Sequence, residues 1–193
     1  MWAVPGFSFV VTLLAGVGAW GMRSRSNPVV GGSFLTGFVM IGTGVMLDLG
    51  WLLRSGVFAS AVFLGVAIGR AIAPNRSSML ILLGVLSVAD IIWIVSGGGS
   101  ATGWEADVVN FSVQLGTSSS SIGTADLVLA AMVTTHWLER DAGVWLALAA
   151  APVGMVVANV YVALTSVDNL PLVPFITLGW LATEAWHRRT AHT

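Results

Sequence analysis

Two aspartates lie inside apolar stretches of this sequence, where an ionised side chain is costly. Asp90 lies in "LLGVLSVADIIWIVSG" and Asp126 in "SSIGTADLVLAAMV", and neither has an Arg or His within one helical turn. An intramembrane carboxylate costs on the order of 3 kcal/mol by insertion scales. Because two facing carboxyls in a low-dielectric site share one proton, they titrate as a unit. The ionised Asp can deprotonate a water molecule while the other protonates a carbonyl oxygen, which is chemistry suited to peptide hydrolysis.

The composition indicates an all-α membrane protein. The chain has 193 residues, of which 56% are hydrophobic and 9% charged, whereas soluble domains carry about 25% charged residues. All eight basic residues are Arg, and the absence of Lys excludes a retinal Schiff base. With no Cys there is no disulfide, thiolate nucleophile or Cys-ligated metal. A net charge of −1 gives no reason to expect a nucleic-acid partner.

The apolar segments predict a single membrane domain over residues 1–193, built as a polytopic bundle of about seven helices. A helix needs roughly 20 apolar residues to cross a bilayer. The expected spans are 3–21, 29–53, 57–73, 78–97, 122–138, 143–165 and 170–186. We favour a first span over a cleaved signal peptide at the N-terminus. The short connectors include "RSRSNP", "RSG" and "PNRS".

The longest connector, 98–121, is rich in Gly and Ser and has an alternating centre, "VVNFSVQL". That centre is compatible with a short strand or with an interfacial helix. A loop of this length in a compact protein is more often functional than not, although a plain linker is the alternative.

The Arg distribution predicts the orientation in the cell membrane. Placing the loop with Arg23 and Arg25 inside leaves Arg54 as the one Arg outside. By the positive-inside rule, the N-terminus is outside, the C-terminus is cytoplasmic, and the loop 98–121 is outside.

Most of the other acidic residues have a simple interpretation as solvated side chains. This group comprises five residues in connectors and one near the end of the last span, namely Glu105, Asp107, Glu139, Asp141, Asp168 and Glu184. Asp48 lies closer to the membrane, and we expect it to pair with Arg54 or a nearby backbone donor.

The predicted spans place the two intramembrane Asp residues at similar depths. At 1.5 Å per residue, Asp90 and Asp126 lie roughly 10 Å and 6 Å from the outer surface. The small residues Gly123, Ala125 and Ala130 permit close packing of the two helices. The structural alternative for either Asp alone is a hydrogen bond to a neighbouring helix, and finding two on adjacent helices weakens it.

Three motifs resemble those of the presenilin and signal peptide peptidase family of intramembrane aspartyl proteases. "SVADIIWI" resembles the Tyr-Asp motif, with Ala89 in place of Tyr. "IGTADLVLAAMV" resembles the Gly-x-Gly-Asp motif and reads Gly123-Thr124-Ala125-Asp126, with Ala125 in place of the second Gly. "NLPLVPFITLG" resembles the Pro-Ala-Leu motif, read here as Pro171-Leu172-Val173. The similarity covers roughly residues 78–186.

The resemblance implies a presenilin-like core in which Asp90 and Asp126 form the catalytic pair. It also implies that the segment Pro171–Val173 packs beside the active site and helps to position substrate, while Gly123, Thr124 and Ala125 support Asp126. Pro171 and Pro174 cannot donate backbone hydrogen bonds, so the start of the last helix should be loosened; Pro171 alone is also a normal helix-start residue. No cofactor or metal is implied. The family typically has nine spans, two more than we expect here.

The predicted orientation matches the signal peptide peptidase branch of the family. The implied substrates are therefore transmembrane or signal-peptide segments with their N-termini inside. Two alternatives stay open: a small proton-coupled transporter or channel using the same carboxylates, and a non-enzymatic scaffold. A transporter of this kind predicts an inverted repeat, and the sequence shows none.

Overall fold

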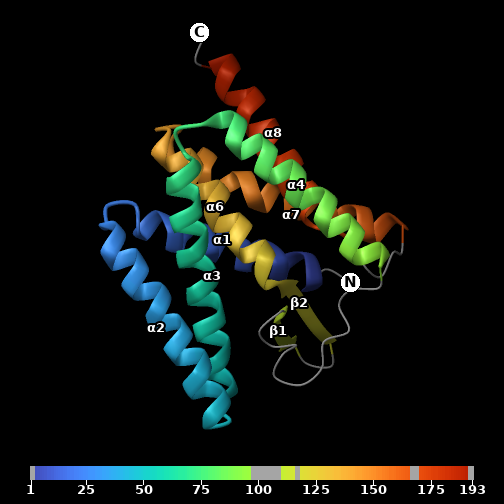
Figure 1. Ribbon diagram of the computed structural model, residues 1–193. Helices are drawn as coiled ribbons and strands as arrows, with labels where there is room; N and C mark the ends of the chain where they lie inside the picture. The colour runs from blue at the N-terminus through green and yellow to red at the C-terminus, as the bar shows by residue number, and fades with distance from the viewer. Residues whose placement is uncertain (1–2, 97–109, 116–117, 166–169, 191–193) are drawn as a thin grey trace.

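A computed structural model describes residues 3–96, 110–115, 118–165 and 170–190, and these form seven helices and one β-hairpin (Figure 1). The helices are α1 (Ala3–Gly21), α2 (Asn27–Met46), α3 (Gly50–Ile72), α4 (Arg76–Val95), α6 (Thr124–Glu139), α7 (Val144–Thr165) and α8 (Val173–Thr190). The strands are β1 (Asn110–Leu115) and β2 (Ser118–Gly123). The expectation of a helical bundle is thus confirmed for the described residues.

The hairpin resolves part of the ambiguity in the long connector. β1 and β2 pair antiparallel, with Asn110 opposite Gly123 and Leu115 opposite Ser118. The residues "NFSVQL" therefore form a strand and not an interfacial helix. Most of the remaining connector, including Glu105 and Asp107, lies outside the described residues, as does Asp168.

Four helices are long and apolar enough to cross a membrane: α2, α3, α4 and, over Val144–Tyr161, α7. This length and composition indicate a membrane-embedded protein. α6 has only 16 residues, or about 24 Å at 1.5 Å per residue, which is less than the hydrocarbon core of about 30 Å.

The turn between α2 and α3 lies closer to the N-terminus than the sequence suggested. α2 ends at Met46 and α3 begins at Gly50, so the expected connector at 54–56 lies inside α3. Asp48 makes the turn with a left-handed backbone, φ 52°, a conformation that Asp and Asn adopt more readily than most residues. The sequence is apolar throughout this region, so hydropathy did not reveal the helix boundary that the backbone conformation of Asp48 creates.

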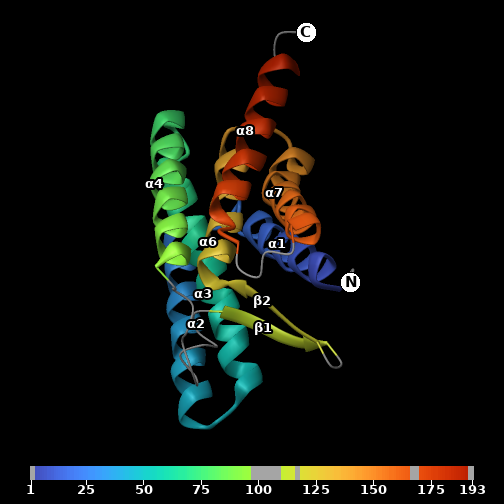
Figure 2. The same cartoon turned by 90° about the vertical axis from the view of Figure 1, so that its right-hand side faces the viewer.

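The short helix α6 is the centre of the bundle. It packs against α1, α3, α7 and α8, and eleven of the twelve residues from Leu127 to Leu138 are buried. α2 and α3 form an antiparallel pair on one side, while α4 lies chiefly against α8 (Figures 1 and 2). Because α6 is enclosed by other helices, protein surrounds most of its length and its shortness does not expose polar backbone to lipid.

Two glycines let α3 approach α6 at backbone distance. A Cβ added at Gly65 would collide with the carbonyl oxygen of Val128, and one at Gly69 would lie 2.8 Å from the carbonyl oxygen of Met132. Glycines four residues apart allow helix backbones to pack closely in a membrane. The sequence "GVAIG" therefore fixes the position of the central helix.

Replacing Gly65 by Val should destabilise the bundle, because the side chain must push α3 away from α6. Overpacking of this kind costs about 1–3 kcal/mol. The matched control is Gly84→Val on α4, where an added Cβ meets nothing within 4 Å in the described structure. Thermal unfolding in detergent, followed by circular dichroism, should show a lower midpoint for Gly65→Val than for Gly84→Val. Equal midpoints would contradict the close α3–α6 packing.

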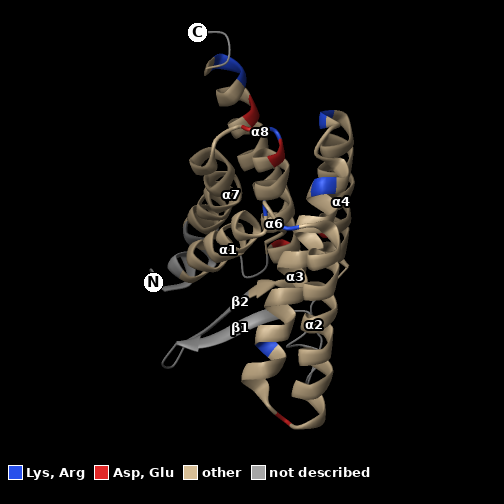
Figure 3. Cartoon of the chain, turned by 90° about the vertical axis from the view of Figure 1, so that its left-hand side faces the viewer, with Lys and Arg blue, Asp and Glu red and all other residues tan. Residues whose placement is uncertain are grey.

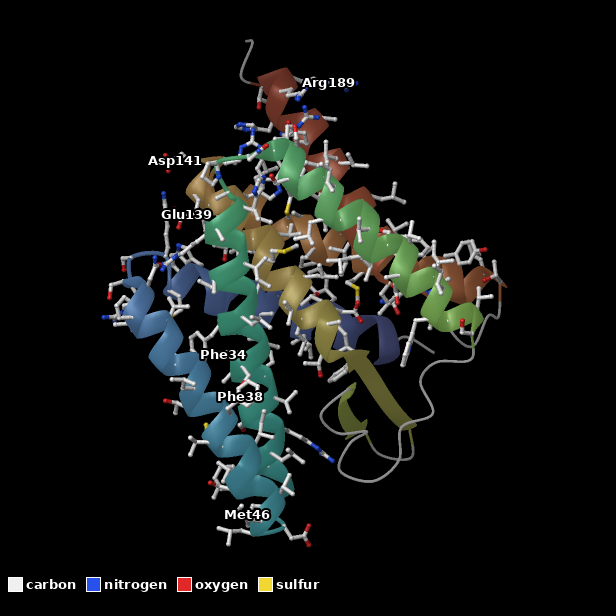
Figure 4. The ribbon with its side chains drawn as sticks, in the orientation of Figure 1. Phe34, Phe38, Met46, Glu139, Asp141 and Arg189 are labelled. Atoms are coloured by element: carbon white, nitrogen blue, oxygen red, sulfur yellow. The ribbon has the colours of Figure 1, made fainter. Side chains whose placement is uncertain are left out.

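Arginine side chains gather at one end of the bundle and connect its elements. Arg23, before α2, pairs with Asp141 at 2.6 Å, and Arg70 at the end of α3 pairs with Glu139 at 3.6 Å. Figure 3 shows the charged residues concentrated near the ends of the helices. In Figure 4 Glu139 and Asp141 lie at this end, and Met46 marks the opposite end of α2.

Candidate functional site

Asp90 presents its carboxylate to the first turn of α8. The Val173 backbone N–H donates a hydrogen bond to Asp90 Oδ2 at 3.0 Å. One turn earlier on α4, the Ser87 hydroxyl lies 3.0 Å from that of Thr177. Thr177 in turn donates to the Val173 carbonyl oxygen at 2.9 Å. One polar stripe of α4 therefore contacts the start of α8 in an otherwise apolar region.

The contact with Val173 has a simple physical cause. The first four N–H groups of a helix have no acceptor within the helix. Val173 is the first residue of α8, so its N–H needs an acceptor from elsewhere, and the Asp90 carboxylate supplies it. Pro171 and Leu172 precede this turn and are half-buried. The segment singled out as Pro171–Val173 thus lies directly against the first intramembrane Asp.

Asp126 occupies the start of the central helix. It is 8% exposed, and its Oδ2 accepts a hydrogen bond of 3.2 Å from the Gly123 N–H. Gly123 precedes the helix and Thr124 is its first residue, whereas Ala125 is exposed. Asp126 therefore lies where the positive end of the helix dipole favours a negative charge.

The two carboxyl groups lie within electrostatic range of each other. Asp90 lies fourteen residues after Arg76 on α4, and Asp126 lies fourteen residues before Arg140 at the end of α6. Each carboxyl is thus about 21 Å along its helix from its Arg. The antiparallel helices bring the two groups to similar depth.

The packing that brings the pair together differs from the one expected. Small residues on α6 were expected to form a close contact with α4, but α4 rests chiefly on α8. Ala130 is fully buried, and an added Cβ at Gly123 would meet only the Asp126 carboxyl within 4 Å among the described atoms. The position of α4, and with it Asp90, is therefore set by packing against α8 and not by direct packing against α6.

Glu184 overturns the expectation of a solvated side chain. It is 3% exposed, and its carboxylate meets three Arg side chains. Arg76 Nε lies 2.8 Å away, Arg140 Nη1 3.1 Å and Arg188 Nε 2.9 Å. These residues come from α4, the end of α6, and α8 itself. The same three elements carry Asp90, Asp126 and Val173 at their other ends. We call this set the Glu184 cluster.

Several buried polar side chains between the Glu184 cluster and the start of α6 were missed by sequence reasoning. Thr134, Thr135 and His136 lie on α6 with exposures of 0–3%. Their Oγ1 atoms and the His136 Nδ1 have no hydrogen-bond partner among the described residues. A buried "TTH" within an apolar helix was a sequence signal for this group.

A structural interpretation of each Asp remains consistent with its own hydrogen bond. Asp126 accepts from the backbone at its helix start, and Asp90 accepts from the first N–H of α8, as capping residues commonly do. Capping alone does not require that both carboxyls come from apolar segments and act on each other. A chemical role is favoured because the two carboxyls lie within electrostatic range and the start of α8 is bonded to Asp90.

The comparisons with known proteins leave the family undetermined. No protein-family model, no curated protein and no solved structure matches this chain.

The α4–α8 contact can be tested by cross-linking, because the chain has no Cys of its own. In the double variant Ser87→Cys/Thr177→Cys, the two thiols replace hydroxyls 3.0 Å apart, and mild oxidation should join them. The bond is detected as loss of labelling by a maleimide-linked polyethylene glycol, restored by reduction. The control pair Ser87→Cys/Thr36→Cys joins α4 to the exposed Thr36 on α2 and should remain fully labelled. Equal protection of both pairs would argue against the arrangement.

Proposed function

We propose that this protein is an intramembrane aspartyl protease that hydrolyses peptide bonds in transmembrane or signal-peptide segments. The observation that carries the proposal is the placement of three segments that are distant in the chain. Val173 donates its N–H to Asp90, and the carboxyls of Asp90 and Asp126 lie within electrostatic range of each other. These are the segments whose sequences resemble the three motifs of the presenilin and signal peptide peptidase family.

The proposed reaction uses the two carboxyls in opposite protonation states. The ionised Asp takes a proton from water, and the resulting hydroxide attacks the scissile carbonyl carbon. The protonated Asp donates its proton to the carbonyl oxygen, which gives a tetrahedral intermediate. Collapse of this intermediate re-forms the carbonyl, returns one hydroxyl proton to the second Asp, and breaks the C–N bond. The leaving nitrogen takes the proton that the first Asp had accepted.

The polar backbone near the pair is suited to holding an unwound substrate. β2 leads directly into α6 through Gly123, and Pro171 and Pro174 reduce the donors available to begin α8. Non-helical backbone at membrane depth is tolerated where it is buried in protein or lines a wet cavity. The hairpin and the start of α8 provide such backbone on either side of the two carboxyls.

The full proposal places seven spans in the cell membrane, with the N-terminus outside and the C-terminus cytoplasmic. The gathering of linked Arg side chains at one end supports it, since the inner face of a membrane protein carries the excess of Arg. At that end, acidic residues form ion pairs with Arg23, Arg70 and the Arg residues around Glu184. This is the orientation of the signal peptide peptidase branch, and it favours substrates with their N-termini inside.

A proton-coupled transporter or channel is the second candidate. Thr134, Thr135 and His136 are buried polar groups on the helix that begins near Asp126 and ends near Glu184. Buried ionisable and polar residues in series are typical of proton relays. A proton flux through liposomes that depends on Asp126 and His136, without cleavage of any peptide, would favour this function over proteolysis.

Asp90→Asn and Asp126→Asn should each abolish cleavage of a model signal peptide by the purified protein, read by mass spectrometry of the products. Loss of a general acid or base lowers the rate by about 10²- to 10⁴-fold. The control Asp48→Asn makes the same chemical change at the α2–α3 turn, where Asn tolerates the left-handed backbone. It should cleave like the unmodified protein. Full activity in either intramembrane variant would refute the two-Asp mechanism.

The orientation predicts the location of the C-terminus. A green fluorescent protein fused after residue 193 should fluoresce, because it folds in the cytoplasm, whereas an alkaline phosphatase fusion at the same position should be inactive. Neutralising the inside Arg residues 23 and 25 together should weaken this preference. An active phosphatase fusion would place the C-terminus outside and reverse the expected substrate direction.

A further inference from the structure

The Glu184 cluster carries more positive charge than it needs. Three guanidinium groups surround a single carboxylate, so two positive charges remain without a partner in the cluster. The other ion pairs described at this end are one to one, Arg23 with Asp141 and Arg70 with Glu139. His136 contacts Arg140 through its Nε2 at 3.4 Å and adds no negative charge. Unlike these two pairs, the Glu184 cluster contains more cations than anions.

The surplus charge is accessible from outside the bundle. The Glu184 side chain is 4% exposed, whereas those of Arg76 and Arg188 are 39% and 54% exposed. Arg188 contacts the carboxylate through Nε, which leaves the terminal nitrogens of its fork for another acceptor. Arg76 belongs to the first turn of α4, where the helix dipole adds further positive potential. These features suit a phosphate group approaching between α4 and α8.

The surroundings favour a phospholipid over a free phosphate ion. Within two helical turns of the cluster along the sequence, α4 and α8 expose apolar side chains, including Ile81 at 66%, Leu178 at 56% and Leu181 at 38%. Acyl chains can cover these side chains while the phosphate meets the Arg residues. Basic pockets between membrane helices on the cytoplasmic side bind acidic head groups in this way. A free phosphate would use the charges and leave the apolar surface unmatched.

We propose that Arg76, Arg140 and Arg188 form a binding site for the phosphate of an anionic phospholipid. The phosphate bridges α4 to α8 and neutralises charge that Glu184 alone leaves uncompensated. Because these helices carry Asp90 and Val173, the bound lipid holds the two sides of the proposed active site together. This last effect rests on the proposed function, whereas lipid binding itself does not.

The test compares phosphatidylglycerol with phosphatidylcholine of the same acyl chains, added to the full chain in neutral detergent. Native mass spectrometry gives the affinity for each lipid, and thermal unfolding gives the stabilisation. Phosphatidylglycerol should bind more tightly. Arg76→Gln and Arg188→Gln should each weaken it by about tenfold, as expected for losing one charge-assisted contact. Arg25→Gln, an equal loss of charge at an exposed position of the same end, should bind like the unmodified protein.

Three results would overturn the site. These are equal binding of the two lipids, an equal loss in Arg25→Gln, or full stabilisation by inorganic phosphate at the same concentration. Arg188 is half-exposed, so Arg188→Gln should fold, and circular dichroism checks this. Asp90→Asn should bind phosphatidylglycerol normally, so a protein without protease activity can still confirm the lipid site. If the protein cleaves peptides but does not bind phosphatidylglycerol preferentially, the lipid site is refuted and the proposed protease function is not.

Discussion

A buried carboxylate can remain charged only if cations compensate it, and Glu184 meets this requirement by drawing together three helices. Removing one partner of a buried pair leaves an uncompensated charge and is strongly destabilising. Because Arg76, Arg140 and Arg188 come from different elements, Glu184 links the ends of α4, α6 and α8 through ion pairs. The equal distances from this end to Asp90 and Asp126 then put the two carboxyls level. The ion pairs of the Glu184 cluster thus help to set the relative depth of Asp90 and Asp126 at the opposite end of these helices.

The carboxyls of Asp90 and Asp126 are compensated by backbone donors in place of cations. Asp126 accepts from the Gly123 N–H at the start of α6, and Asp90 accepts from the Val173 N–H at the start of α8. Two helix N-termini therefore point their positive ends toward one region. The same field that tolerates the carboxylate charge also stabilises negative charge developing on a nearby carbonyl oxygen. In the proposed reaction, structural capping and stabilisation of the intermediate use one electrostatic arrangement.

Local properties of the sequence predicted the helical bundle and the two candidate Asp residues. An acidic residue without a local partner in an apolar run can be identified from the sequence alone, and Asp90 and Asp126 were identified in this way. The helix that packs against α4 could not be predicted, because small residues on α6 permit close packing without specifying which helix will pack there. Glu184 was assigned to solvent for a similar reason. Its three Arg partners include two that lie 108 and 44 positions away along the chain, and only folding brings them to one carboxylate.

The turn at Asp48 and the hairpin show two further limits. One left-handed residue ended α2 early, and no hydropathy average detects a single backbone angle. The alternation in "NFSVQL" suited a strand, but its partner "SSSSIG" has no alternation of its own. The sequence allowed a strand or an interfacial helix at this position without deciding between them, and it gave no sign of the residues that pair with the strand.

That uneven pairing gives the hairpin a graded stability. At the end next to α6, Phe111 is the strand partner of Ile122, and Ile122 is buried, so this end has a defined alignment. Farther out, β1 pairs with four consecutive Ser residues, and a shift of two positions there exchanges one Ser for another. Strands with little difference between positions specify their register weakly. The register of the hairpin is therefore specified at the end that joins α6, where Ile122 is buried, and is specified weakly along the Ser residues.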